Sequence, residues 1–281
     1  MQHVIAKNEE NEEWLMEKKI VFFDVDGTML HLPGGMYEPL PSTCEAVRLL
    51  QEKGHYAVVA SARGKLPAVL EKLNFDGFIG CNGNYITFHQ EVLYDNYFKP
   101  ENLDFLLGLF REYDAPFNFT GSLGIWSSPA DHPVLQRHRE LFGADLSGDE
   151  PWLFSWQPEE IHSGMVTAMF AAEQQMLTCR DCLPKDWLVD MYTTENIRMD
   201  IHLPGHTKGK GVRFLHEKLG IDFANTFAFG DARNDLEMMR QVNYGIAMGN
   251  ATEELKAAAF AVTDDVDKDG IYKALKKYGV I

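Results

Sequence analysis

The sequence predicts an α/β protein with a doubly wound parallel sheet and a second, α+β domain inserted into it. Two observations support this fold class. Short apolar runs alternate with helical patterns over residues 18–84 and again over 194–281, which is the order of a parallel sheet covered by helices. Between them, residues 85–193 carry paired strand candidates, with aromatic residues and prolines concentrated in the middle. Residues 1–17 are predicted to be an N-terminal extension, outside the fold.

The first core segment is predicted to follow a β-α-β-α-β order. An apolar run at 20–23 is the first strand, and a flap turns back at Pro33-Gly34-Gly35. Ser42 is expected to cap the first helix, which stops near Gly54. The remaining predicted elements are a strand at 56–60, a helix at 66–73, a strand at 78–80 and a turn at 82–84.

The inserted segment and the second core segment have different patterns. The insertion is predicted to hold antiparallel strands at 85–89 and 92–98, helices at 101–113 and 132–142, and strands at 116–127, 164–171 and 187–192. The parallel order then resumes with a helix at 208–219, a strand at 226–230, a helix to 240, a strand at 244–248, a helix at 252–258, a strand at 260–263 and a helix from 270.

Composition limits the classes of partner. The chain has 281 residues, 45% of them hydrophobic and 24% charged, which is ordinary for a globular protein. The formal net charge of -16 argues against nucleic acid as a partner, since phosphate backbones are bound by lysine and arginine. There is no apolar run near the roughly 20 residues of a membrane span and no apolar signal segment at 1–19, so the cytoplasm is the expected location.

Polar side chains follow three predicted strands where those strands end, and a lysine opens a predicted helix. The set is Asp24, Asp26, Ser61, Lys208, Asp231, Asn234 and Asp235. Because parallel strands end at one edge of a sheet, these side chains can converge although they are far apart in sequence. Several carboxylates together favour an ion with oxygen ligands such as Mg²⁺. A simpler interpretation is that Asp24 and Asp26 only form a turn after the strand.

Four other features have more ordinary interpretations. Cys179 and Cys182 have the spacing of half a zinc site, but Cys44 and Cys81 are too far apart in sequence to be expected as a second ligand pair. Pro204 and Gly205 separate His202 from His206, so these histidines are expected in a loop rather than on a metal-binding helix. The aromatic side chains of the insertion could line a pocket, but they are expected mainly in its core; they are Trp126, Trp152, Trp156 and Trp187. Arg63 is expected to pair with an acidic neighbour.

The order of these motifs resembles the haloacid dehalogenase (HAD) superfamily, and the insertion resembles the cap of its Cof-type (subclass IIB) phosphatases. The matching residues are Asp24-Val25-Asp26-Gly27-Thr28, Ser61, Asn82-Gly83, Lys208-Gly209, Gly230-Asp231-Ala232-Arg233-Asn234-Asp235, Ala247-Met248-Gly249-Asn250-Ala251 and Asp269-Gly270-Ile271. The resemblance spans residues 18–281 and implies a Rossmann-like core. Ser61-Ala62-Arg63 stands where Thr-Gly-Arg is more usual in the family, but Ser61 keeps the hydroxyl.

The resemblance implies a role for each motif. Asp24 would be the nucleophile that forms an aspartyl-phosphate, and Asp26 the general acid and then the general base. Mg²⁺ would be held by Asp24, the backbone carbonyl of Asp26 and Asp231, with Asp235 supporting them from behind. The phosphate oxygens would be held by Val25, Ser61, Ala62, Lys208 and Asn234.

The resemblance also implies a substrate class. The expected substrates are small phosphorylated metabolites, with sugar phosphates first, then pyridoxal phosphate or flavin-type mononucleotides. A phosphomutase would retain the same motifs, and a non-catalytic protein that binds phosphorylated ligands could use the same fold. The oligomeric state is left open.

Overall fold

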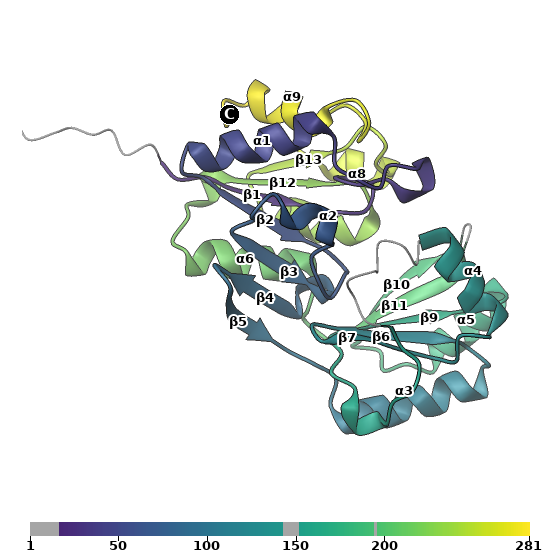
Figure 1. Ribbon diagram of the computed structural model, residues 1–281. Helices are drawn as coiled ribbons and strands as arrows, with labels where there is room; N and C mark the ends of the chain where they lie inside the picture. Colours follow the sequence, from purple (N-terminus) through teal and green to yellow (C-terminus); the bar gives the residue numbers. More distant parts are fainter. Residues whose placement is uncertain (1–16, 143–151, 194–195) are drawn as a thin grey trace, which may run out of the picture.

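Two β-sheets, one in each lobe of the molecule, organise the residues that the computed structural model describes, which are 17–142, 152–193 and 196–281 (Figure 1). The core sheet has the strand order β14 (Ala261–Val262), β13 (Tyr244–Ala247), β12 (Thr226–Gly230), β1 (Ile20–Phe23), β2 (Tyr56–Ala60), β3 (Gly77–Gly80), β4 (Tyr85–Phe88) and β5 (Glu91–Asp95). The strands from β14 to β3 run parallel, and β4 and β5 continue the sheet in antiparallel pairs. This arrangement confirms the doubly wound α/β core.

Helices cover both faces of the core sheet because side chains alternate along its strands. Val21 and Phe23 pack on the face covered by α1 (Pro41–Glu52), α2 (Ala68–Glu71) and α9 (Gly270–Lys277). Ile20 and Phe22 pack on the face covered by α6 (Lys208–Lys218), α7 (Leu236–Arg240) and α8 (Glu253–Ala258). In Figure 1, α1 and α9 lie on one side of the sheet and α6 on the other. Strand β1 is therefore buried on both faces, which explains its continuous apolar sequence.

The second lobe, which we call the cap, is built on the sheet with strand order β10 (Leu188–Tyr192), β11 (Arg198–His202), β9 (Met165–Met169), β6 (Phe117–Gly121), β7 (Gly124–Ser127) and β8 (Trp152–Leu153). Its helices are α3 (Pro100–Glu112), α4 (Pro133–Phe142) and α5 (Glu173–Asp181). Apolar side chains of α3 and α5 form one core with alternate residues of the sheet, among them Phe119, Val166 and Ile201. The residues between these, such as Thr167 and Asp200, belong to the opposite face of the sheet.

Short 3₁₀ helices connect several strands: η1 (Leu32–Gly34), η2 (Cys81–Gly83), η3 (Pro158–Glu160), η4 (Phe223–Asn225) and η5 (Arg233–Asp235). The flap predicted after Asp26 contains η1 and is closed by an antiparallel bridge between His31 and Met36. Within the part of the chain that the structure describes, no helix is long and apolar enough to cross a membrane.

Several element predictions need correction. Strands β4 and β5 lie in the range predicted for the insertion, but they pair with the core sheet, whereas β11 lies in the predicted core range and pairs within the cap. The chain therefore passes from the core sheet to the cap near Phe98 and returns to the core near Pro204, rather than at the predicted boundaries of 85 and 193. Helix α2 covers only Ala68–Glu71, and the sequence analysis missed α5. The extension predicted at 1–17 lies almost wholly outside the described residues.

Ser42 does not cap the first helix. Helix α1 begins at Pro41, its N-cap residue is Leu40, and the Ser42 hydroxyl donates to a carboxylate oxygen of Asp269 at 2.6 Å. Proline at the first position needs no N–H partner and has a φ suited to the helix, so the helix starts two residues earlier than a Ser42 cap would place it.

Candidate active site

The site is built where three neighbouring parallel strands end. In the sheet register, Phe23 of β1 lies beside Phe229 of β12 and Val59 of β2. Asp24 follows β1, and its backbone N–H donates to the carbonyl of Phe229 at 3.0 Å. Because the register aligns the strand ends, residues that are about 200 positions apart in sequence come together.

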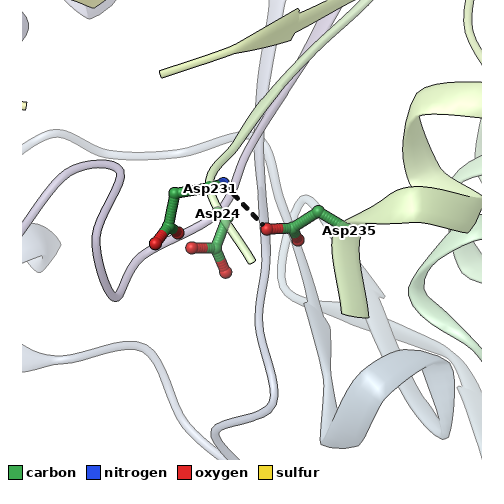
Figure 2. A group of neighbouring side chains, drawn as sticks. All are labelled: Asp24, Asp231 and Asp235. Carbon is green, nitrogen blue, oxygen red and sulfur yellow. Dashed lines mark hydrogen bonds between the residues drawn. The ribbon is translucent and has the colours of Figure 1, made fainter. Parts of the chain in front are cut away.

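A cluster of three carboxylates, two of them buried and that of Asp231 partly exposed, lies at these strand ends (Figure 2). One oxygen each of Asp24, Asp231 and Asp235 lies within 4.8 Å of the others. One oxygen of Asp235 accepts hydrogen bonds from the backbone N–H groups of Asp231 at 3.0 Å and Ala232 at 3.1 Å. Asp235 therefore fixes the turn after β12 in the orientation that directs Asp231 toward Asp24.

Gly27 allows the loop after β1 to approach this cluster. Its φ is +95°, and a Cβ at this position would lie 2.1 Å from a carboxylate oxygen of Asp231. The next residue, Thr28, donates its hydroxyl to the other oxygen of Asp231 at 3.3 Å. Any side chain at position 27 would therefore push Asp231 out of the cluster.

Lys208 is the cation of the cluster. It opens α6, it is 1% exposed, and its Nζ lies 2.5 Å from Asp24 and 2.8 Å from Asp235. Burial alone would lower the pKa of this lysine, but the two carboxylates outweigh that effect and raise the pKa above its usual value. Lys208 is therefore held as a cation beside the Asp24 carboxylate.

The cluster carries more negative charge than its lysine can neutralise. Burial, and then the Asp235 carboxylate, raise the pKa of Asp24 to about 7 although Lys208 works against them. Burial and the neighbouring carboxylates also raise the pKa of Asp231 well above its usual value. Three ionised carboxylates and one lysine leave an excess of two negative charges, which a divalent cation would balance. The oxygen-only donor set fits a hard ion such as Mg²⁺.

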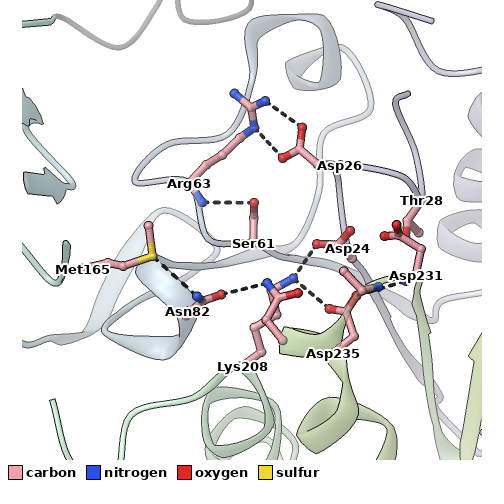
Figure 3. Close-up of polar contacts among 12 residues, drawn as sticks. Asp24, Asp26, Thr28, Ser61, Arg63, Asn82, Met165, Lys208, Asp231 and Asp235 are labelled. Carbon is pink, nitrogen blue, oxygen red and sulfur yellow. Dashed lines mark hydrogen bonds and ion pairs between the residues drawn. The ribbon is translucent and has the colours of Figure 1, made fainter. Parts of the chain in front are cut away.

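Asp26 lies apart from this cluster, although it follows Asp24 by only two residues. Its carboxylate, whose side chain is 47% exposed, accepts two hydrogen bonds from the Arg63 guanidinium, at 2.9 and 2.7 Å (Figure 3). Burial tends to raise the pKa of Asp26, but the Arg63 guanidinium outweighs it and the pKa lies below the usual value. Arg63 thus pairs with an acidic neighbour, as the sequence predicted.

The predicted phosphate-binding residues lie at different depths around this site. Ser61 is 1% exposed, and its hydroxyl accepts from the Arg63 backbone N–H at 3.1 Å. Val25 is fully buried. A cavity of about 290 Å³ between core and cap is lined on its core side by Asp24, Asp26, Ser61, Ala62, Arg63, Ala232 and Asn234. Lys208 lines a neighbouring cavity, together with Asn234.

The cap contributes the other wall of the 290 Å³ cavity, which we call the substrate cavity. This wall consists of Asn118, Thr120, Ile125, His138, Trp152, Met165, Thr167, Tyr192, Arg198 and Asp200. It is mostly polar, and Asp200 accepts the Thr167 hydroxyl at 2.7 Å. The sequence analysis missed these residues. The alternation of apolar and polar residues along β6, β9 and β11 is the signal that could have identified this face.

The structure also shows where the cysteines, histidines and tryptophans considered in the sequence analysis lie. Cys179 is buried and Cys182 exposed, and the acidic cluster is the one candidate metal site among the described residues. The loop prediction is wrong for His202, which lies in β11 and is 2% exposed, but right for His206. Of the tryptophans, Trp126, Trp156 and Trp187 pack in or against the core of the cap, and Trp152 lines the substrate cavity.

Comparisons with known proteins agree with this geometry. Residues 21–275 match the family model described as haloacid dehalogenase-like hydrolase. A Bacillus subtilis protein named "Putative phosphatase YkrA" is 31% identical over 272 residues, which are 95% of this chain and all of that protein. The B. subtilis 5-amino-6-(5-phospho-D-ribitylamino)uracil phosphatase YcsE is 22% identical over 92% of this chain and 95% of its own length.

A solved structure has the same fold over nearly the whole chain. The HAD subclass IIB sugar phosphatase BT4131 is 28% identical, with a TM-score of 0.80 over 94% of this chain and all of that one. The match covers both the core and the cap. The chain therefore belongs to the haloacid dehalogenase-like hydrolases, and within them it is a Cof-type (subclass IIB) phosphatase.

Proposed function

We propose that the enzyme hydrolyses small phosphorylated metabolites, sugar phosphates first among them, in a Mg²⁺-dependent reaction through an aspartyl-phosphate on Asp24. The observation that carries this proposal is the position of Asp24, which lies beside Lys208 and two other carboxylates and also lines the substrate cavity. With such substrates, the cytoplasm is the proposed location.

In the first proposed step, a carboxylate oxygen of Asp24 bonds to phosphorus as the bond between phosphorus and the ester oxygen breaks. Asp26 gives a proton to the departing oxygen. In the second step a water attacks the same phosphorus, Asp26 takes its proton, and the acyl-phosphate bond breaks to restore the Asp24 carboxylate. Splitting the displacement in this way leaves Asp24 and Asp26 as they began.

The geometry supports a second position for Asp26. While Arg63 holds it through two hydrogen bonds, Asp26 is ionised and suited to take a proton rather than give one. Donation to the leaving oxygen therefore requires the carboxyl group to leave Arg63 and turn toward the substrate. The 47% exposure of its side chain leaves room for this rotation.

We assign the metal to Asp24, Asp231 and the backbone carbonyl of Asp26, with Asp235 orienting Asp231. When bound, Mg²⁺ would neutralise charge on the phosphoryl oxygens and on the attacking carboxylate. Lys208, Ser61, Asn234 and the backbone N–H groups of Val25 and Ala62 would hold the phosphoryl oxygens, which gain most from such donors in the transition state.

The lining of the substrate cavity supports a sugar phosphate. Carboxylate, amide and hydroxyl groups of Asp200, Asn118 and Thr120 can exchange hydrogen bonds with several substrate hydroxyl groups. The similarity to a sugar phosphatase points the same way. A second candidate is a phosphate ester that carries a flat ring, such as a flavin-type mononucleotide, because two aromatic residues, Trp152 and Tyr192, line the same cavity.

The proposal is tested by measuring phosphate release from a metabolite panel in the presence of Mg²⁺. We expect turnover of sugar phosphates, loss of activity with a chelator, and better rescue by Mg²⁺ than by Ca²⁺, because the smaller ion enforces octahedral geometry. Phosphate release from no compound would favour a non-catalytic binding protein. A requirement for an added phosphate donor, with isomerised product, would identify a phosphomutase.

A further inference from the structure

We propose that Asn82 and His202 form a positioning pair through which the cap orients the amide of Asn234 at the phosphate site. The inference rests on the proposed phosphate-binding role of Asn234. It assigns His202 and Asn82 a function in the reaction although neither lines the substrate cavity.

Asn82 stands between the core and the cap. It lies in η2 between β3 and β4, has a φ of 49° and is 4% exposed. Its side-chain oxygen accepts from Nδ2 of Asn234 at 3.3 Å. Its own Nδ2 lies 3.3 Å from Nε2 of His202 and 3.5 Å from Sδ of Met165, and the contact with Met165 is drawn in Figure 3. One buried amide therefore joins a residue of the phosphate site to two strands of the cap.

The backbone of Asn82 is tied to the same site. Its N–H donates to the carbonyl of Ser61 at 3.0 Å, and the N–H of the preceding Cys81 donates to the carbonyl of Arg63 at 2.9 Å. The loop that carries Ser61 and the side chain of Asn234 thus share one neighbour. A displacement of Asn82 would reach both residues.

The orientation of the Asn234 amide matters because the two sides of an amide differ. Its nitrogen can donate two hydrogen bonds, and its oxygen only accepts them. With one hydrogen given to Asn82, the second hydrogen of Nδ2 is available to a phosphate oxygen. If the amide turned over, its oxygen would take that place and repel the phosphate.

Asn82 is in turn oriented by the cap. The thioether sulfur of Met165 can accept a hydrogen bond, and Nε2 of His202 accepts one in the tautomer that carries its proton on Nδ1, so with that tautomer this side of the Asn82 amide is the nitrogen. His202 is itself positioned by β11, and its Nε2 also lies 3.5 Å from a carboxylate oxygen of Asp190 on β10. When the cap contacts the core, Asn82 is held in one orientation, and this fixes Asn234.

Neither residue of the pair lines the substrate cavity. Asn82 and His202 line the neighbouring cavity of about 300 Å³, whereas Asn118, Asp200 and the other polar cap residues face the substrate. Among the residues that the structure describes, Asn234 alone lines both cavities. The pair therefore acts on the reaction through Asn234, and its removal should weaken the hold on the phosphoryl group rather than on the rest of the substrate.

The test is a double-mutant cycle between His202→Leu and Asn234→Ala, measured with nitrophenyl phosphate and with a sugar phosphate. We expect His202→Leu to lower kcat/KM about tenfold for both substrates, as the loss of one well-placed hydrogen bond to a charged group would. In the Asn234→Ala background, His202→Leu should cause no further loss. His202→Gln, whose side-chain oxygen can still accept from Asn82, should stay within about threefold of the wild type.

Asn96→Ser is the matched control. The Asn96 amide bonds to Asn84 at 3.1 Å and to His206 at 3.2 Å in the same region between the lobes, but it does not contact Asn234. We expect its kcat/KM to equal that of the wild type, and melting temperatures would show that all variants are folded.

Three results would overturn the inference. Equal losses from His202→Leu with and without Asn234 would show that His202 acts by another route. A loss for the sugar phosphate alone, or an equal loss in Asn96→Ser, would show that the cap is merely disturbed. Wild-type kcat/KM in Asn234→Ala would overturn the phosphate role of Asn234 and the inference together, whereas the first two results would leave the proposed function intact.

Discussion

The buried position of Asp24 lowers the stability of the fold when its carboxyl group is ionised. Burial and the Asp235 carboxylate raise its pKa to about 7, so ionising it costs free energy when no cation is bound. Because its pKa is about 3.8 in the unfolded chain, the folded state binds the proton more tightly. The contribution of Asp24 to stability therefore falls as the pH rises between these two values. In the proposed function this cost is offset when the cluster binds a cation and a phosphoryl group.

Asp24→Asn should abolish turnover without lowering the melting temperature. The change removes the nucleophile, but it also removes a negative charge that the buried site disfavours above pH 7. Steady-state kinetics and thermal unfolding at pH 8 in chelator would measure the two effects. Turnover above a few percent of the wild-type rate would contradict the covalent mechanism.

Asp26→Asn should separate the two steps according to the leaving group. Nitrophenolate leaves without a proton, so the variant should release about one equivalent of nitrophenol in a burst and then turn over slowly, because water still needs a base. With a sugar phosphate both steps should be slow, by about a hundred- to ten-thousand-fold. Stopped-flow absorbance and the intact mass of the quenched protein would detect the burst and the phosphoenzyme. Wild-type steady-state rates would exclude Asp26 as the acid and base.

In the strands of the cap sheet, alternate side chains face the core of the cap and the substrate cavity. Met199 and Ile201 of β11 pack into the core of the cap, whereas Arg198 and Asp200 line the substrate cavity. Because side chains alternate along β11, one strand contributes both to the stability of the cap and to the lining of the substrate cavity. Substitutions on the cavity face should change selectivity, and those on the other face should change stability.

Asp200→Asn should lower kcat/KM for a sugar phosphate about tenfold and leave nitrophenyl phosphate nearly unchanged. A carboxylate accepts hydrogen bonds from hydroxyl groups more strongly than an amide does, and nitrophenol has no such hydroxyl groups to offer. Asp95→Asn is the matched control, because Asp95 contacts His162 outside the substrate cavity. Equal losses for both substrates would show that Asp200 supports the fold or the phosphate site instead.

The junction between α1 and β2 should make stability depend on pH. His55 is 4% exposed, and its Nδ1 accepts the backbone N–H of Lys19 at 3.2 Å. Burial, and then nearby lysines, lower its pKa from 6.5 to about 4. The folded state therefore keeps His55 neutral while the unfolded chain takes up a proton, so this contribution is complete above about pH 6.5 and is lost as the pH falls toward 4.

The His55→Gln variant should lose part of the acid sensitivity of stability. Between pH 7 and pH 4.5, the free energy of unfolding of the wild type should fall by about 1–2 kcal/mol more than that of the variant. Urea unfolding at the two pH values, without metal, would give this difference. Parallel pH profiles for the two proteins would exclude His55 as the source.

For the whole molecule, the main constraint is the close packing of chain segments where the two lobes join. Gly83 has a φ of +99°, and a Cβ there would lie 2.3 Å from the carbonyl oxygen of Thr207, the N-cap residue of α6. Asn82 and Lys208 are the neighbours of these two residues in the chain. The contact therefore holds the positioning pair and the buried lysine in register.

Gly83→Ala should lower both stability and activity, because Thr207 would have to move and carry Lys208 with it. The control is Gly54→Ala, whose φ of +77° is similar but whose Cβ would meet no atom within 4 Å. Gly54→Ala should cost roughly 1–2 kcal/mol for the left-handed backbone alone and leave kcat unchanged. Thermal unfolding and kcat would be compared, and equal effects of the two changes would show that the contact with Thr207 is unimportant.

The parallel core and the residues that converge at its edge could be predicted from local sequence patterns. Three of these residues directly follow a strand in the sequence; they are Asp24, Ser61 and Asp231. Parallel strands of one sheet end at the same edge, so residues that follow them lie close together. The position of these residues follows from local sequence and chain order alone. The same applies to Lys208, whose place at the start of α6 could be predicted from the helical pattern that follows it.

Which strands belong to which sheet, and which side chains meet between the lobes, could not be predicted in this way because both depend on long-range packing. Strands β4 and β5 have an antiparallel pattern that suits either sheet, so only pairing with β3 places them in the core. The contacts of Asn82 with His202 and Asn234 join residues 120 and 152 positions apart. Such contacts depend on how the cap packs against the core, because local periodicity specifies which face a side chain takes but not what lies opposite it.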